Sequence, residues 1–260
     1  MNKQYNVAVC LLIKDEGRYL PEWLAWHVGQ GVEHFYIYDN GSAVPVMDSI
    51  PEEYAGMVTV VDFPPPRNNT QWEAYADCLA RFGGETEWMA FLDTDEFLRV
   101  VDGSTIQAFL ADYPEADGVL AKWVIYDANG QMEDMGGPVR ERFTRTTDLY
   151  PYEMPQCKSI VRAGRVVTMG AHGPIATQHS LWVVNENHER VRQGGGELPA
   201  EKIVVDHYFT RSYAEWKEKM ARGSCDPIYA RDNEWFLRMN PDLAEAVAAL
   251  EAEAGEGEST

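Results

Sequence analysis

Three carboxylates fall within four residues at the end of an apolar run, in the stretch WMAFLDTDEFL (88–98). Asp93 and Asp95 can point the same way there, because residues along a strand alternate between its two faces. Carboxylates on one face repel each other unless they are protonated or bridged by a cation. Mg²⁺ and Mn²⁺ prefer such oxygens and leave positions for phosphate and water. The stretch predicts a clamp for a metal-bound diphosphate; a solvated acidic turn or helix start is the alternative.

Strand and helix patterns alternate through residues 1–112, which predicts an α/β fold with a mostly parallel sheet and helices on both faces. The expected strands are 6–13, 34–39, 56–63 and 88–92. The expected helices follow the first and third strands, and the second of them should bury Trp72, Tyr75, Ala76 and Leu79. Ligands of such sheets bind at the carboxyl ends of the strands. The acidic loops at 14–16, 39–40 and 93–96 should therefore converge on one edge.

The second half of the sequence is less regular. Strands are expected from residue 118, on both sides of Gly164, and at 202–209. Capping boxes predict helices that start at Ser104 with Gln107 and at Ser212 with Glu215. Residues 241–260 read as an acidic helix with a flexible tail.

The composition narrows the functional classes. The 42 acidic residues exceed the 22 basic ones by 20, so a nucleic-acid partner is not expected. Four cysteines without C-x-x-C spacing fit buried thiols of a reducing compartment. No apolar run is long enough to span a membrane. The expected location is the cytoplasm of a bacterium, with contact to a membrane surface left open.

One rival motif uses the same letters. Haloacid-dehalogenase phosphatases carry D-x-D after an apolar strand, but they need Thr or Val two residues after the second Asp. Phe97 occupies that position here, and three strands precede the motif. This reading therefore has little support.

Longer blocks resemble a known group of enzymes. LLIKDEGRYLPEWLAWHVGQGVEHFYIYDNGS (11–42) and TQWEAYADCLARFGGETEWMAFLDTDEFL (70–98) resemble family 2-like and family 92 glycosyltransferases. The later blocks VRERFTR, KSIVR, HGP and HYFTRSYAEWKEKMARG follow in the same order. The resemblance covers roughly residues 5–225, which makes it more specific than D-x-D alone.

The resemblance implies a GT-A fold, a Rossmann-like sheet flanked by helices, in a single domain over 1–240. Residues 1–112 would bind the nucleotide sugar, and 113–225 would form a smaller acceptor side. The implied enzyme is an inverting, Mn²⁺- or Mg²⁺-dependent transferase that moves a hexose, with galactose as the candidate, from a UDP-sugar to a glycan or glycoconjugate. The implied metal ligands are Asp93, Asp95 and His207. The implied donor-binding residues are Lys14, Glu16, Asp39, Gln71, Asp93 and Arg211, and the further catalytic candidates are Lys158 and His172.

Several roles stay open at this point. Asp39 also fits a turn before Gly41, and His207 also fits a packed core. Glu96 could tie a neighbouring loop as well as take part in catalysis. Acceptor-side carboxylates that could act as the base are Asp127, Glu133, Asp134, Glu141, Glu153 and Glu186, of which Glu133 and Asp134 are preferred.

Two other functions compete with sugar transfer. A nucleotidyltransferase shares such a sheet, although the basic, glycine-rich loop it would want after the first strand is missing. A non-catalytic saccharide-binding protein could use the eight Trp residues, but it has no need of a D-x-D at a strand end. The sequence leaves the oligomeric state open.

Overall fold

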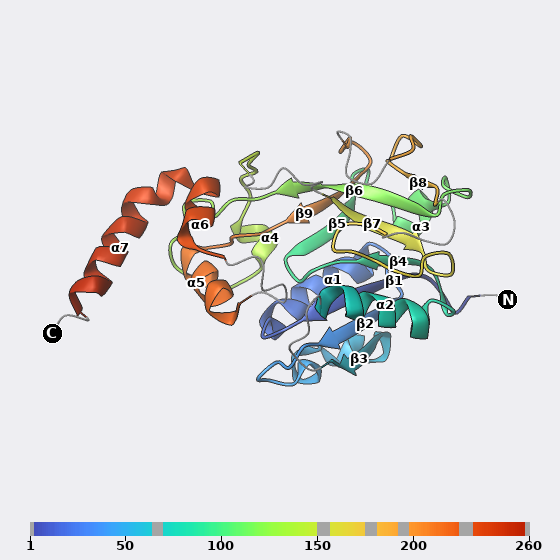
Figure 1. Cartoon of the computed structure of the whole chain (residues 1–260), viewed down its shortest axis with the longest axis horizontal. Coiled ribbons are helices and arrows are strands. Elements are labelled where there is room, and N and C mark those ends of the chain that lie inside the picture. Colours follow the sequence, from blue (N-terminus) through green and yellow to red (C-terminus); the bar gives the residue numbers. More distant parts are fainter. Residues whose placement is uncertain are drawn as a thin grey trace. The chain divides into compact units, whose positions relative to one another are not determined.

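The apolar runs of the sequence form a mixed β-sheet, and the amphipathic runs form helices (Figure 1). The computed structural model describes residues 3–63, 70–149, 157–174, 181–191, 198–223 and 231–257. The strands are β1 (Tyr5–Ile13), β2 (His34–Asp39), β3 (Val58–Asp62), β4 (Thr86–Phe91), β5 (Glu96–Val100), β6 (Gly118–Ile125), β7 (Cys157–Arg162), β8 (Val183–Val184) and β9 (Ile203–His207). The α-helices are α1 (Leu20–Gly29), α2 (Thr70–Phe82), α3 (Ile106–Leu110), α4 (Val139–Arg142), α5 (Tyr213–Arg222), α6 (Asn233–Met239) and α7 (Ala244–Gly257).

The chain forms two compact units. The first comprises Met1–Val124 and Met154–Asp206, and the second comprises Ile125–Glu153 and His207–Thr260. The expected α/β sheet and the D-x-D stretch belong to the first unit. Among the described residues, no helix has the length and apolar character needed to cross a membrane.

The sheet has a parallel half and a mixed half. Its order is β3-β2-β1-β4-β7-β6-β9-β5, with β8 beside β6. β3, β2, β1 and β4 are parallel, whereas β7 runs antiparallel to both β4 and β6. The register pairs Ile13 with Asp39 and Cys10 with Phe91, so the carboxyl ends of these strands lie along one edge. The predicted α/β class and the parallel order of the first four strands are confirmed.

Helices cover both faces of the parallel half because its strands are apolar at nearly every position. On one face, Cys10 and Tyr38 pack in a cluster with Tyr75 and Cys78 of α2. On the other face, the ring of Trp23 of α1 packs at a tilt against that of Phe35 of β2, with 5.5 Å between the ring centres. The prediction that Trp72 is buried was wrong. Its side chain is 44% exposed, because the buried stripe of α2 consists of Ala74, Tyr75, Cys78 and Leu79, and Trp72 lies at the edge of that stripe in the first turn.

β5 was not predicted, and it explains why the apolar letters resume after the three carboxylates. Side chains of α1 form hydrogen bonds with the backbone of β5. Trp26 donates to the Leu98 carbonyl at 2.9 Å, and His27 Nε2 accepts from the Leu98 amide at 3.1 Å. Gln30 accepts from the Val100 amide in the same way. These bonds hold the residues after the D-x-D turn against α1.

The local helix signals gave mixed results. The capping box of Ser212 and Glu215 is present at the start of α5. The box predicted at Ser104 was wrong, because Thr105 caps α3 and Gln107 donates instead to the Gly31 carbonyl. The strand expected after Gly164 was also wrong, since the described residues 163–174 hold only an isolated bridge there. Three cysteines are free and buried, Cys10, Cys78 and Cys157, and Cys225 lies outside the described residues.

Candidate active site

The D-x-D stretch forms a tight turn between β4 and β5 in the first unit. The Glu96 amide donates to the Asp93 carbonyl at 3.1 Å, which closes the turn. The indole N–H of Trp23 lies within hydrogen-bonding distance of two carbonyls, Asp93 at 3.1 Å and Glu96 at 2.9 Å. The Leu92 amide donates to the Cys10 carbonyl and continues the pairing with β1. The buried indole thus fixes the backbone that carries the carboxylates.

Two side chains from other elements hold the carboxylate of Asp93. Gln71 of α2 donates to Asp93 Oδ1 at 2.9 Å, and Lys158 of β7 donates to Oδ2 at 2.8 Å. The Asp93 side chain is 36% exposed, whereas that of Lys158 is 2% exposed. Gln71 also donates to the Tyr75 hydroxyl at 2.9 Å, which fixes its own orientation. Gln71 and Lys158, two site residues that the resemblance implies, therefore both contact Asp93.

Glu96 is the buried member of the cluster. Its Oε2 accepts from the Asp93 amide at 2.9 Å and lies 3.1 Å from the Lys158 ammonium. Burial raises the pKa of Glu96 to about 8, although Lys158 acts to lower it; Asp93 and Asp95 raise it further. Burial lowers the pKa of Lys158, but the neighbouring Asp93 and Glu96 outweigh it, and the net pKa is raised. Lys158 therefore lies against two carboxyl groups, and burial holds the pKa of Glu96 above its usual range.

Asp95 lies in the same turn and is only 5% exposed. Its neighbour Thr94 donates a 2.5 Å hydrogen bond to Glu16, which follows the end of β1. The loops after β1 and β4 are thereby joined, as the convergence of acidic loops requires.

The loops after β1 and β2 are joined as well. Asp15 adopts a left-handed backbone with φ of 51° and accepts from the Ala43 amide at 2.7 Å. Asp39 accepts from the Ser42 amide at 2.8 Å, so the turn role that the sequence left open for Asp39 is present. Lys14 is half-buried directly after β1. The expected acidic edge is therefore an ordered set of turns.

His172 also belongs to the first unit. Its Nδ1 lies 3.1 Å from the Cys157 carbonyl, and its ring meets that of Trp123 edge-on at 5.1 Å. These contacts place His172 beside Cys157, the first residue of β7, which directly precedes Lys158.

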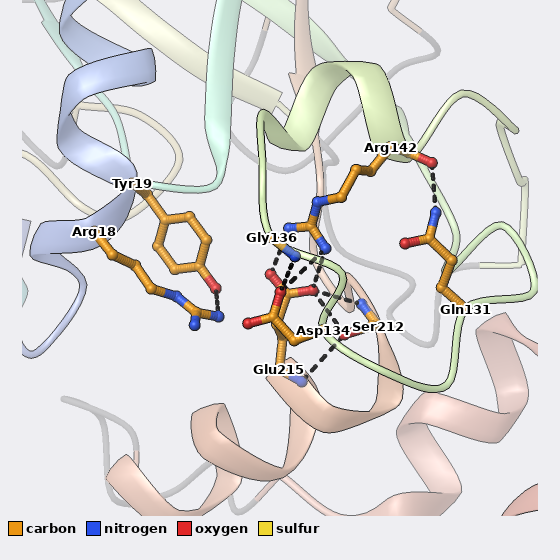
Figure 2. Close-up of polar contacts among 8 residues, drawn as sticks. All are labelled: Arg18, Tyr19, Gln131, Asp134, Gly136, Arg142, Ser212 and Glu215. Carbon is orange, nitrogen blue, oxygen red and sulfur yellow. Dashed lines mark hydrogen bonds and ion pairs between the residues drawn. The ribbon is translucent and has the colours of Figure 1, made fainter.

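The second unit holds Asp134, one of the two preferred base candidates, in a braced loop (Figure 2). Arg142 donates to Asp134 at 3.4 Å and forms two bonds with Glu215, at 2.9 and 2.8 Å. Glu215 is also the partner of Ser212 in the capping box of α5. Asp134 further accepts from the Gly136 amide at 3.0 Å. Its exposed neighbour Glu133 has no such brace among the contacts described.

His207 and Arg211 lie in the second unit too. His207 is 4% exposed, and its ring meets that of Phe209 edge-on at 5.5 Å. Arg211 is buried with a left-handed φ of 55°, directly before the cap residue Ser212. Both stay predictions as metal or donor contacts.

Two of the open base candidates have structural roles. Asp127 accepts from Arg145 at 2.6 Å and from the Asn129 amide at 2.8 Å. Glu186 accepts from three consecutive backbone amides, those of Glu201, Lys202 and Ile203, which fastens its turn to the start of β9. Glu153 lies outside the described residues.

Fold and site together define the class. A parallel half-sheet with helices on both faces, and a D-x-D turn at the carboxyl end of β4, is the GT-A arrangement of glycosyltransferases. The chain belongs to glycosyltransferase family 92, because the model of that family matches residues 5–225. A family 92 protein of Ricinus communis is 30% identical over 229 residues, which cover 85% of this chain and 38% of that protein. One of Arabidopsis thaliana is 30% identical over 84% of this chain and 38% of its own length.

More distant matches are shorter or looser. Galactan beta-1,4-galactosyltransferase GALS1 of Arabidopsis thaliana is 29% identical over 106 residues, 36% of this chain and 21% of that protein. The solved TarS 1–349 structure of S. aureus shares 17% identity over 61% of this chain and 47% of that chain. Its TM-score of 0.40 is too low to bear on the site. The chain spans under two fifths of the length of the curated family 92 relatives above, and these plant proteins do not support the expected bacterial source.

Proposed function

We propose that this glycosyltransferase moves a hexose from a UDP-sugar to a glycan acceptor with the help of a divalent metal. The observation that carries the proposal is the Asp93-Thr94-Asp95 turn at the carboxyl end of β4. Gln71 and Lys158 fix Asp93 there, and Glu16 from the next loop contacts Thr94. A solvated acidic turn would not be held by the half-buried Gln71 of α2 and the buried Lys158 of β7.

The donor proposal rests on charge and on the relatives. An acidic protein with an excess of 20 negative charges needs a cation to hold a diphosphate, and the carboxylate edge can bind one. A carboxylate in the loops after β1 and β2 can accept from uracil N3, which favours UDP. Galactose is the first sugar to test because GALS1 and GALS3 of Arabidopsis thaliana are named as galactan beta-1,4-galactosyltransferases.

The residues present fit a hard dication in an open site. Gln71 and Lys158 hold the two oxygens of Asp93, and the resemblance assigns Asp95 as the direct metal ligand and places Asp93 at the ribose and metal. In the part of the chain that is described, no group of three or more His, Cys, Asp or Glu side chains could hold a metal ion. The remaining positions would thus come from donor phosphates and water, as is usual for Mg²⁺. When bound, the metal would stabilise the charge on the departing diphosphate.

The chain's own residues supply binding and proton transfer. Gln71 and Lys158 orient Asp93 toward the donor, and a carboxylate on the acceptor side takes the proton of the attacking hydroxyl in an inverting displacement. Glu133 is our preferred base over Asp134, because Arg142 braces the latter. His207 as a third metal ligand, and Arg211 and His172 as contacts of the diphosphate and acceptor, remain predictions of the resemblance. A cytoplasmic location remains a prediction from the cysteines and apolar runs of the sequence.

A donor panel tests this function. The protein would be incubated with Mn²⁺, a β-1,4-galacto-oligosaccharide and, in turn, UDP-galactose, UDP-glucose, UDP-N-acetylglucosamine and GDP-mannose. We expect acceptor-dependent UDP release and an acceptor lengthened by one hexose, both stopped by EDTA. If only GDP-mannose gave nucleotide release and a lengthened acceptor, the protein would still be a transferase, but its donor would not be a UDP-sugar. No lengthened acceptor with any donor would contradict the proposal.

A further inference from the structure

A pocket of about 250 Å³ opens on the first unit between the segment after α3 and the segment around β8. Its lining includes Tyr113, Pro114, Trp182 and Val184, together with the acidic residues Asp112 and Glu115. Pockets with a mainly apolar lining and a few polar groups bind small molecules, and this one is below the drug-sized range of about 300–1,000 Å³. The space suits one small ring.

Hydrogen bonds fasten the two walls of this pocket to each other. The Asp117 amide donates to the Trp182 carbonyl, and the Trp182 amide donates back to the Asp117 carboxylate, both at 2.8 Å. The Tyr113 hydroxyl donates across to the Glu186 carbonyl at 2.7 Å. Arg162 of β7 donates to the carbonyls of Ala116 at 2.9 Å and Pro114 at 3.0 Å. The pocket is therefore preformed, which reduces the entropy lost on binding.

Two aromatic rings of the pocket, those of Trp182 and His188, stay exposed although each has a packing partner. Trp182 is 46% exposed, and the exposed His188 ring stacks on Tyr113 at 4.4 Å with an angle of 17° between the rings. The Arg190 guanidinium lies 5.1 Å from the centre of the Trp182 ring. Flat rings beside hydrogen-bond acceptors match a sugar, whose C–H face is apolar and whose hydroxyls donate.

The pocket lies at the opposite end of the sheet from the D-x-D turn. Trp88 of β4 pairs with Arg162, whose amide donates to the Asp117 carbonyl at 2.9 Å. Asp93 follows Trp88 by five residues, and a strand rises about 3.3 Å per residue, so the two places are roughly 16 Å apart along the strand. The pocket is thus separate from the donor site.

We propose that this pocket is a second saccharide-binding site, which holds one neutral sugar unit of a glycan away from the catalytic turn. Asp112, Glu115 and the overall negative charge disfavour an anionic guest. A cationic guest would have to stack on the Trp182 indole, and the Arg190 guanidinium beside that indole would repel it. A neutral sugar is repelled neither by the acidic residues nor by Arg190. It can pack on the rings and donate hydrogen bonds to the acidic residues.

Binding without donor tests the site independently of the transfer reaction. β-1,4-galactotetraose, cellotetraose and maltotetraose would be titrated into the metal-free full chain by calorimetry. We expect at least one to bind, with an affinity about tenfold lower in Trp182→Ala.

Three further variants complete the test. Asp95→Asn should bind the oligosaccharide normally, because that change disables only the proposed donor site. Trp72→Ala, which removes a similarly exposed indole from α2, is the matched control. Glu115→Gln is a second pocket variant that keeps the volume and weakens binding by removing a charged acceptor.

The outcomes separate the alternatives. Equal binding by wild type and both pocket variants, all with unchanged melting temperatures, would overturn the site. So would no binding of any of the three oligosaccharides. Binding of spermidine that Trp182→Ala abolishes, without saccharide binding, would replace the sugar by a cation. A loss of binding in Asp95→Asn would place the sugar at the catalytic turn instead.

Discussion

Asp95→Asn is expected to lower the rate of sugar transfer by about a thousandfold while the protein stays folded. A metal supplies several kcal/mol of charge stabilisation to such reactions, and each 1.36 kcal/mol corresponds to a factor of ten. Asn keeps the size of the side chain but removes the charge that would bind the metal. The measurement is UDP release from the donor that the panel selects, at saturating Mn²⁺.

The matched control for this prediction is Asp48→Asn, which neutralises an exposed aspartate outside the site. It should transfer sugar like the wild type, and both variants should melt close to the wild-type temperature. Wild-type activity in Asp95→Asn would remove Asp95 from the donor site. Equal losses in the two variants would indicate a general effect of charge on the protein.

Lys158→Met should produce the largest loss of stability among the site variants, about 3 kcal/mol in the free energy of unfolding. Removing one partner of a buried ion pair costs about 3–5 kcal/mol, because the other charge is left without compensation. The lower end applies here because the Asp93 side chain is 36% exposed and can still reach water. Urea denaturation of the metal-free protein measures the change.

Two comparisons make the result specific to the ion pair. Lys122→Met makes the same exchange on β6, where the half-buried Lys122 pairs in register with Cys157, and should cost under about 1 kcal/mol. Glu96→Gln should also be mild, because burial already raises the pKa of Glu96 and so disfavours its charged form, and Gln keeps an oxygen for the Asp93 amide. A Lys158→Met protein as stable as Lys122→Met would show that the pair does not support the turn.

Local patterns predicted the parallel half of the fold well. The continuous apolar letters of 6–13 and 34–39 can be accommodated only where both faces are covered, and they form β1 and β2 between α1 and α2. The face of α1 was also predictable, since Leu20, Trp23, Leu24 and His27 recur at helical spacing and are buried. These features depend on residues that are close in sequence.

What the sequence could not show depends on distant partners. The sequence left Glu96 open between tying a neighbouring loop and taking part in catalysis. In the fold it begins β5 and lies 3.1 Å from Lys158, which comes 62 positions later in the chain. No local pattern indicates that Lys158, a catalytic candidate of the resemblance, contacts Asp93. The pocket at Trp182 was missed because its walls come from segments about 70 residues apart. An exposed Trp next to short strands was the available signal.

The most direct test of the central claim is calorimetric titration of UDP into the wild-type chain with Mn²⁺, the same chain with EDTA, and Asp95→Asn with Mn²⁺. A donor site built on this turn predicts binding that requires the metal and weakens at least about a hundredfold in the variant. Equal UDP affinity in all three titrations would contradict a metal clamp at Asp93-Thr94-Asp95.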